Sequence, residues 1–414
     1  MAGLASAREL RREGHDVTVL EQNADVGGQW LYDPRSDGAD DPLGAAETVK
    51  VHGSLYASLR AISARENMGF TDFHFAPKDG RDGRRFPGHR EVQLYLRDFC
   101  DAFGLMEAVR LNTRVLRVAM AVAPTRKWTV RSVHEGTEEE EVFDAVVVAN
   151  GHYSQPRLPS IQGMEAWRGR QMHSHSPWRL EEVTPGLAEV LAKHSANLHL
   201  QLHVERLCED GLVVFGGGGS GVLADTIIYC TGYNYSFPFL HTAGAVTVDD
   251  NRVGPLFEHV FPPSLAPSLS FVGIPIKVFA PRFFEAQAKW GAQVLSGRRT
   301  LPPEQEMMRS VEEYYRAREI AGVPKKYTHG VYLSETMPTY MDDFGSKYCD
   351  FPRVERWHHE LVLSLFANMN NNLETFREEY QDTDSICKGV EEWHLSAQHP
   401  QAAPAAKKMS LGLS

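Results

Sequence analysis

The sequence has few cysteines, and none is placed for a cysteine-based function. The 414 residues contain five, and no two of them form a C-x-x-C pair. None stands with histidine at the spacing of a zinc site. These spacings exclude a disulfide framework, a structural zinc site and a dithiol redox centre, and they predict a reducing compartment. The five are Cys100, Cys208, Cys230, Cys349 and Cys387.

A long apolar run and a signal-like N-terminus are also lacking. No stretch reaches the roughly 18 consecutive apolar residues that a membrane span needs. Residues 1–16 are already charged and helical in pattern, unlike a signal peptide. We therefore expect a cytoplasmic protein without a membrane span.

An excess of basic residues is absent as well. Lys plus Arg number 43 against 54 for Asp plus Glu, and the net charge of −11 is spread along the chain. This balance argues against nucleic-acid binding. Hydrophobic residues at 42% and charged residues at 23% are typical of globular proteins, which excludes a disordered chain or a rod. At about 150 residues per domain, the length predicts two or three domains.

What is present is an alternation of helical and strand patterns. The chain opens with the helical spacing of residues 3–12, followed by a Gly14 stop and a strand at 16–21. A β-meander is expected from Asn197 to Cys230. The remaining predictions are helices at 94–109, 283–295 and 304–321, strands at 113–118, 127–130 and 142–149, an exposed hairpin tip at Glu135–Glu141, and a disordered tail at 398–414.

The first helix and strand carry half of a dinucleotide-binding motif. Gly3 opens the helix and Glu21 ends the strand about 18 residues later, close to the spacing at which an acidic residue accepts the ribose hydroxyls. A carboxylate there favours FAD or NAD over a 2′-phosphorylated ribose. Gly27 and Gly28 follow at once and let the backbone run close to a bound cofactor, while Trp30 can pack near a flavin ring.

With these residues the sequence resembles the flavin-containing monooxygenases, in particular the plant S-oxygenating branch associated with glucosinolate side chains. The resemblance covers nearly the whole chain, and its most diagnostic piece is Trp167–His173, similar to an F-x-G-x-x-x-H fingerprint with Trp for Phe. The other matching segments are Val51-His52, Ser54–Tyr56, Ser58–Arg60, Arg65-Glu66, Met68–Phe70, Phe86–His89, Asp144–Tyr153, Asp225–Tyr233, Phe271–Pro275, and Glu285, Gln287 and Trp290.

The resemblance implies an α/β fold of two dinucleotide-binding, Rossmann-like modules, the second inserted in the first and truncated, with a β-meander. The expected boundaries are 1–165 and 236–397 for the FAD-binding part, 166–235 for a remnant of the NADPH-binding part, and 398–414 for the tail. The implied cofactors are FAD and NADPH. The implied cofactor-binding residues are Gly3, Glu21, Gly28, Gln29, Trp30, Val115, Asn150, Gly151 and Gln287.

The implied reaction is an NADPH- and O₂-dependent oxygenation of a soft nucleophile, a thioether sulfur or an amine, through a C4a-hydroperoxyflavin. The partners are then a small-molecule substrate and O₂. In such enzymes the cofactor performs the chemistry while the protein excludes water, which agrees with the lack of a catalytic triad or metal motif. His89 and His173 lie on matched motifs without a visible acid/base partner, and a structural role suits them equally.

The sequence departs from the family pattern at four places. A first strand ending in G-x-G does not precede Gly3, and no second glycine loop followed by a helix stands after Trp178. Gly216–Gly221 formally matches G-x-G-x-x-G, but a strand pattern follows it, which indicates a hairpin turn. The family commonly has Asn at Ile62. Pro177-Trp178 reverses the Trp-Pro order of the Baeyer–Villiger relatives.

These departures leave three hypotheses open. The first is an active monooxygenase. The second is an impaired or inactive flavoprotein remnant that acts, if at all, by binding a partner, because lost phosphate contacts of about 1.5–3 kcal/mol each weaken cofactor binding. The third is a flavin oxidase that does not use NADPH. The substrate and the oligomeric state do not follow from the sequence.

Overall fold

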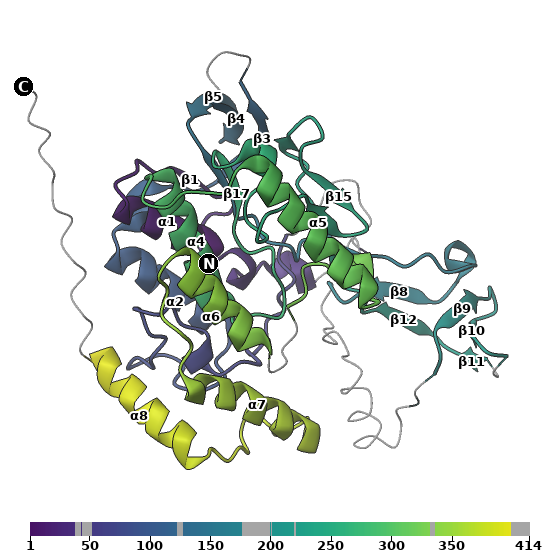
Figure 1. Cartoon of the computed structure of the whole chain (residues 1–414). Coiled ribbons are helices and arrows are strands. Elements are labelled where there is room, and N and C mark those ends of the chain that lie inside the picture. Colours follow the sequence, from purple (N-terminus) through teal and green to yellow (C-terminus); the bar gives the residue numbers. More distant parts are fainter. Residues whose placement is uncertain are drawn as a thin grey trace, which may run out of the picture.

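The computed structural model describes residues 1–37, 43, 52–121, 127–175, 199, 201–218, 221–331 and 336–398. The predicted tail at 398–414 lies outside this part except for Gln398, which ends a helix, and Pro177-Trp178 and the centre of the Gly216–Gly221 turn lie outside it as well. Within it, no helix has the length and apolarity to cross a membrane. Figure 1 shows a body of helices around short strands, from which a small group of strands projects.

The N-terminal part of the body is built on two parallel strand pairs. The strand β1 (Val19–Leu20) pairs with β2 (Val109–Arg110), and β6 (Val146–Val148) pairs with β17 (Leu269–Phe271). The helix α1 (Ala2–Arg12) packs closely on α4 (Ala280–Leu295), although the two are far apart in the sequence (Figure 1).

The two pairs leave strand edges without a partner. The Glu21 amide donates to the Arg110 carbonyl in β2. Because successive residues of a parallel strand point their peptide groups to opposite sides, the N–H and C=O of Leu20 point away from β2. In β6 the Val146 amide and the Val148 carbonyl bond toward β17, so the N–H and C=O of Val147 point away from β17. In the described part of the chain these edges of β1 and β6 carry no further strand.

A four-stranded sheet in the order β14-β3-β4-β5 stands beside these pairs. Its three long strands form an antiparallel meander in which Trp128 and Val130 are buried. The acidic run is part of β5 and pairs with β4, whereas only Glu135-Gly136 turn, so the prediction of a hairpin tip at Glu135–Glu141 was wrong for most of the run. The strands are β3 (Thr113–Met120), β4 (Trp128–His134), β5 (Thr137–Phe143) and β14 (Leu240–His241).

The projecting group comes from the middle of the chain (Figure 1). Its strands β9, β10 and β11 form an antiparallel sheet, as the predicted meander requires, but β12 leaves it to pair in parallel with β8. Gly216–Gly221 joins β10 to β11, which confirms the hairpin reading. The strands are β8 (Arg170–His173), β9 (Val204–Leu207), β10 (Leu212–Phe215), β11 (Val222–Leu223) and β12 (Thr226–Tyr229).

Long helices form much of the remaining body. The predicted helix at 94–109 begins earlier, as α2 (His89–Ala102), and its last turn is the 3-10 helix η4 (Leu105–Ala108). The helix predicted at 304–321 is α5 (Glu304–Ile320). Three more, α6 (Thr336–Tyr348), α7 (Arg356–Asn371) and α8 (Asp384–Gln398), were not predicted. Short elements are β7 (Gln155–Pro156), β13 (Tyr233–Asn234), β15 (Thr247–Asp249), β16 (Arg252–Gly254), and 3-10 turns at 28–30, 34–37, 65–67, 164–166, 263–265 and 325–327.

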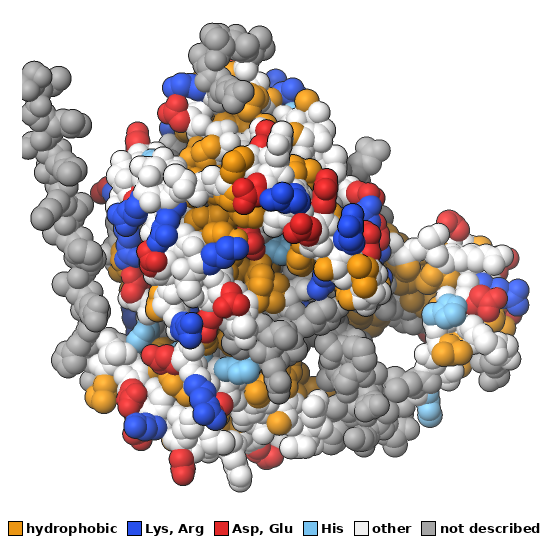
Figure 2. Space-filling view, viewed as in Figure 1, with side chains coloured by type: hydrophobic (Ala, Val, Ile, Leu, Met, Phe, Trp, Pro, Cys, Tyr) orange, Lys and Arg blue, Asp and Glu red, His pale blue; other side chains and the backbone are white. Residues whose placement is uncertain are grey.

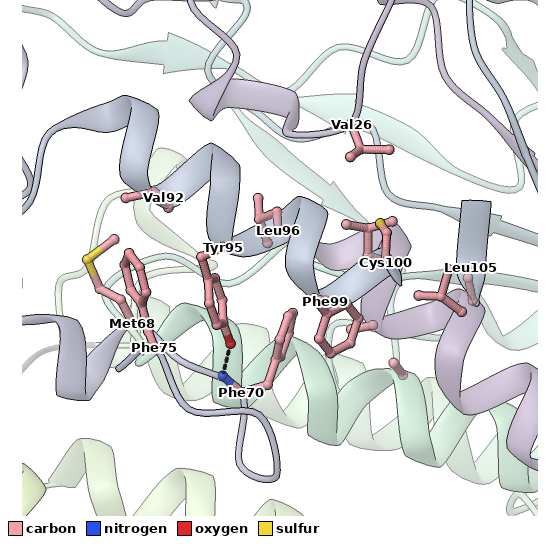
Figure 3. Packing of buried hydrophobic residues seen from close by; sticks show 14 of the residues in the cluster. Val26, Met68, Phe70, Phe75, Val92, Tyr95, Leu96, Phe99, Cys100 and Leu105 are labelled. Atoms are coloured by element: carbon pink, nitrogen blue, oxygen red, sulfur yellow. Dashed lines mark hydrogen bonds between the residues drawn. The ribbon is translucent and has the colours of Figure 1, made fainter. Parts of the chain in front are cut away.

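The apolar face of α2 organises the N-terminal core. Figure 3 shows Val92, Tyr95, Leu96 and Phe99 projecting from this helix, where the Tyr95 hydroxyl accepts a hydrogen bond of 2.8 Å from the Phe70 amide. The spacing of these residues is the helical repeat that the sequence shows. On the face drawn in Figure 2, Lys/Arg and Asp/Glu side chains are interspersed.

Candidate functional site

A single large cavity collects most of the predicted site. Its volume is about 1930 Å³, larger than the roughly 300–1,000 Å³ of pockets for drug-sized ligands, so it has room for an extended cofactor together with a substrate. It runs between β1 and β6, under the N-terminus of α1. Its lining includes Gly3, Glu21, Gly28, Gln29, Trp30, Val115, Asn150 and Gly151.

The N-terminus of α1 supplies backbone donors to the cavity. No side chain caps this helix, and Gly3 lies in its first turn against β6. A Cβ added at Gly3 would meet the Ala149 Cβ at 3.8 Å, an ordinary contact, so helix packing does not require glycine here. The uncapped amides and the positive end of the helix dipole fit a phosphate.

Glu21 is fixed at the end of β1 by Asn23. Its Oε1 accepts bonds from the Asn23 amide at 2.9 Å and from the Asn23 side chain at 3.0 Å. Burial raises the pKa of Glu21, and these bonds act against that shift. The carboxylate is thereby oriented at the carboxyl end of a parallel strand, where ribose hydroxyls are bound in dinucleotide folds.

Gly28 opens the loop toward the cavity. It has a φ of 56°, and an added Cβ would meet no atom within 4 Å. Gly27 is packed instead, since a Cβ there would come 3.1 Å from Gln93. Gln93 holds the loop by donating to Asp25 at 2.8 Å. The open side of Gly28 is therefore a place where a ligand can approach the backbone.

Asn150, Gly151 and His152 follow β6 at its carboxyl end. Asn150 donates to the Ser236 carbonyl at 3.2 Å, and His152 Nδ1 lies 3.1 Å from the Gly273 carbonyl. Burial lowers the pKa of His152 to about 4, so the ring is neutral. The His152 contact ties the carboxyl end of β6 to the turn after β17, and the Asn150 contact ties it to the segment after β13.

Gln287 lies outside the cavity lining. It is fully buried on α4, and its Oε1 accepts a bond of 3.1 Å from the Gly273 amide. Its place in this structure is behind the cavity wall, where it holds the Gly273 turn against α4. A direct contact with a cofactor stays a prediction for this residue.

His89 and His173 also lie outside the lining. His89 Nε2 is 3.2 Å from the Ala57 carbonyl. His173 is buried, and its Nδ1 accepts a bond of 3.0 Å from the His175 amide. In the described residues no group of three or more His, Cys, Asp or Glu is arranged for a metal ion.

The sequence reading missed a buried ion-pair network between α1 and α4. Arg8 is 2% exposed and reaches Glu285 on α4, Glu9, and Asp72, the last at 2.6 Å. Glu285 also accepts bonds from the Thr71 amide and hydroxyl, at 2.9 and 2.7 Å. Burial alone would lower the pKa of Arg8, but the carboxylates raise it overall. The available signal was an arginine in the apolar stripe of a helix, four residues after Leu4.

The second missed feature is the part of α7 that lines the cavity, because the sequence reading did not predict this helix. The face consists of Val362, Leu365, Phe366 and Met369.

The chain matches the family described as "Flavin-binding monooxygenase-like" over residues 1–184 and 194–354. The chain belongs to this family. It is 49% identical to the Arabidopsis thaliana protein named flavin-containing monooxygenase FMO GS-OX-like 8, over 93% of this chain and 91% of that protein. It is 48% identical to the Arabidopsis FMO GS-OX-like 9, over 95% and 94%. These matches confirm the family, and with it an enzyme, as the sequence predicted.

Solved structures agree with this assignment. S-allyl-L-cysteine S-oxygenase from Allium sativum superposes with a TM-score of 0.85 at 40% identity, covering 95% of this chain and 96% of that one. Tmm from a Pelagibacter strain shares the fold, with a TM-score of 0.69 at 19% identity, over 91% and 90%. The predicted mixed α/β class is confirmed at this level.

Proposed function

We propose that this flavin-containing monooxygenase binds FAD in the cavity and uses NADPH and O₂ to oxygenate a soft nucleophile, a thioether sulfur in the first place and an amine in the second. The observation that carries the proposal is that eight of the nine cofactor-binding residues implied by the resemblance line one cavity. The name of the Allium enzyme, an S-oxygenase of a thioether amino acid, supports sulfur as the reacting atom.

The residues present fit the cofactor. The N-terminus of α1 would hold the pyrophosphate, Glu21 the adenosine ribose, and the open side of Gly28 the neighbouring part of the dinucleotide. Bound flavin supplies the oxygen-activating chemistry. Trp30, Ile62, Met68 and Phe279 line the cavity as well and would exclude water from the place where bound flavin supplies this chemistry.

For the domain arrangement we propose the boundaries given by the sequence. Residues 1–165 and 236–397 would form the flavin module, and 166–235 a reduced nicotinamide module. The parallel pair of β8 and β12, with the small antiparallel sheet beside it, supports a separate unit there.

Gly28 provides the sharpest test of the flavin site. Gly28→Asp puts a carboxylate beside the bound phosphates, and we expect at least a tenfold loss of FAD affinity, equivalent to about 1.4 kcal/mol. Aspartate tolerates the left-handed backbone better than most residues. The measurement is the flavin absorbance of purified protein and its titration with FAD.

Gly104→Asp is the matched control, because Gly104 has a φ of 60°, no atom within 4 Å of an added Cβ, and no place in the cavity lining. It should retain the wild-type flavin content. Wild-type protein that folds but takes up no FAD would overturn the proposal and favour an inactive remnant. Bound flavin that yields peroxide without NADPH would favour an oxidase.

A further inference from the structure

The helix α7 is docked firmly beside the cavity. The His358 ring at its start pairs with Asn67, Nδ1 to Oδ1 at 2.8 Å, and the Asn67 amide donates to the His358 carbonyl at 3.4 Å. Burial lowers the pKa of His358 to about 3, so the neutral ring keeps this geometry at physiological pH. A helix held in this way at its first turn is a rigid wall.

One face of α7 is both core and cavity wall. Leu365 and Met369 are 7% exposed and belong to the cluster against which Ile62 packs. Val362 is 8% exposed and packs in the neighbouring cluster. With Phe366 these three residues recur at helical spacing and line the cavity. Leu363 lies on the same helix but is 46% exposed and does not line it.

The character of the lining differs from one part of the cavity to another. In the described structure, α7 contributes four apolar side chains and no charged one. The charged and ionisable residues come from other segments, among them Glu21, Arg110, Arg114 and Lys277. An uncharged hydrocarbon gains free energy on burial against the α7 face, whereas a carboxylate or ammonium would lose its hydration there without a partner on α7.

We propose that the α7 face formed by Val362, Leu365, Phe366 and Met369 selects the substrate, by taking the uncharged aliphatic or aryl arm of a thioether. This inference rests on the proposed function for the identity of the reacting sulfur. It names the substrate class as thioethers whose arm next to sulfur is apolar and carries no charge. Leu365 and Phe366 are specificity-determining residues.

The test compares two thioethers of similar shape, methyl p-tolyl sulfide and 4-(methylthio)benzoate, by calorimetric binding to the purified full chain with and without added FAD. The wild type should bind the neutral sulfide at least tenfold more tightly than the benzoate. Leu365→Ala and Phe366→Ala should each weaken binding of the neutral sulfide about tenfold, the scale on which a hydrophobic pocket senses the loss of a few methylene groups.

Leu363→Ala is the matched control and should bind both compounds like the wild type. Flavin content and melting temperature are recorded for every variant. Phe366 is only half-buried, so Phe366→Ala tests the wall even where Leu365→Ala does not fold. Equal affinity for the two compounds, or Phe366→Ala binding the neutral sulfide like the wild type, would overturn the inference.

The two proposals fail in different ways. Protein that takes up no FAD, or whose NADPH consumption does not respond to any thioether, contradicts the proposed function while the binding contrast still decides the α7 wall. Protein that turns over thioethers but shows no contrast between the neutral and the charged compound contradicts the wall alone.

Discussion

Arg8 is the residue on which the N-terminal packing most depends. It joins α1 to Glu285 on α4, and it also pairs with Glu9 and Asp72. Glu285 and Glu9 are buried, whereas Asp72 is partly exposed to water. Replacing Arg8 with Met removes the charge but keeps the bulk, and leaves Glu285 buried without its cation, while Glu9 keeps its ion pair with Arg12. We expect a loss of about 3–5 kcal/mol in the free energy of unfolding, measured by urea denaturation.

The control for this prediction is Arg11→Met on the same helix. The Arg11 side chain is 39% exposed, and its ion pair with Glu107 lies at the surface. Exposed pairs contribute about 0–1 kcal/mol, so this variant should unfold near the wild-type urea concentration. Similar losses in both variants would show that the buried network is not the source of stability.

A pair of buried histidines predicts how stability depends on pH. His329 Nε2 accepts a bond of 2.9 Å from the Val253 amide, so its proton is on Nδ1, which faces His259 Nδ1 at 2.9 Å. His259 must then be a neutral acceptor. Burial, with a contribution from the Arg318 charge, lowers the pKa of His259 to about 4 from the ordinary 6.5.

Between pH 6.5 and about 4 the unfolded chain binds this proton and the folded chain does not. The contribution of His259 is therefore complete above pH 6.5 and declines as the pH falls through this window. Thermal unfolding midpoints at pH 7, 6 and 5 should decrease less in His259→Gln than in the wild type. The exposed His241→Gln should keep the wild-type slope, and an unchanged slope in His259→Gln would contradict the assignment.

At the scale of single residues, the sequence predicts well where backbone and charge requirements are local. Gly3, Glu21 and Gly28 follow from the spacing of one helix, one strand and one loop, and all three line the cavity. Gln287 and Arg8 behave differently. Arg8 pairs with Glu285, which is distant in the sequence, and Gln287 pairs with Gly273, which lies on another element. No local sequence pattern shows such pairings.

At the scale of elements, α8 depends on a close approach to α7. A Cβ at Gly389 would lie 2.2 Å from the Trp357 ring, so Gly389→Ala must push the helices apart. We expect a loss of about 1–3 kcal/mol in stability, typical of overpacking. Proteolysis within α8 should become faster, since α7 is one of the surfaces on which this helix packs, beside the stacking of Trp393 on His74.

Gly291 on α4 is the counterpart for that test. It is buried in a helix, and an added Cβ would meet nothing within 4 Å. Gly291→Ala should therefore stabilise the protein by about 0.5–1 kcal/mol, because alanine loses less backbone freedom on folding. A loss of stability in Gly291→Ala would indicate that the low helix propensity of glycine is not what limits the stability of α4.

Elements with a strong periodic pattern were predicted and weakly patterned ones were not. The segments at 3–12, 283–295 and 304–321 are helices as expected. The strand at 16–21 shrinks to β1, since only Val19 and Leu20 have a ladder partner among the described residues. The acidic run became strand because β4 lies beside it, and pairing overrode its polarity.

At the scale of the whole molecule, the site is assembled from segments that only the fold brings together. The cavity wall combines the chain start, the strand before residue 150, and α7 near residue 365. Family resemblance predicted the first two from motif order. The α7 wall carries no motif, because an apolar face that lines a cavity has the same sequence pattern as one that packs in a core.

The outward peptide groups of Leu20 and Val147 have a consequence for handling the purified enzyme. Both residues line the cavity, and open strand edges that a bound cofactor does not cover are templates for pairing with other chains. Light scattering should therefore rise with protein concentration, and mild warming should accelerate the rise. Thr18→Pro removes an amide on the same edge as Leu20 and should delay the onset of turbidity. Scattering that stays constant up to high protein concentration would mean that neighbouring side chains already cover these strand edges.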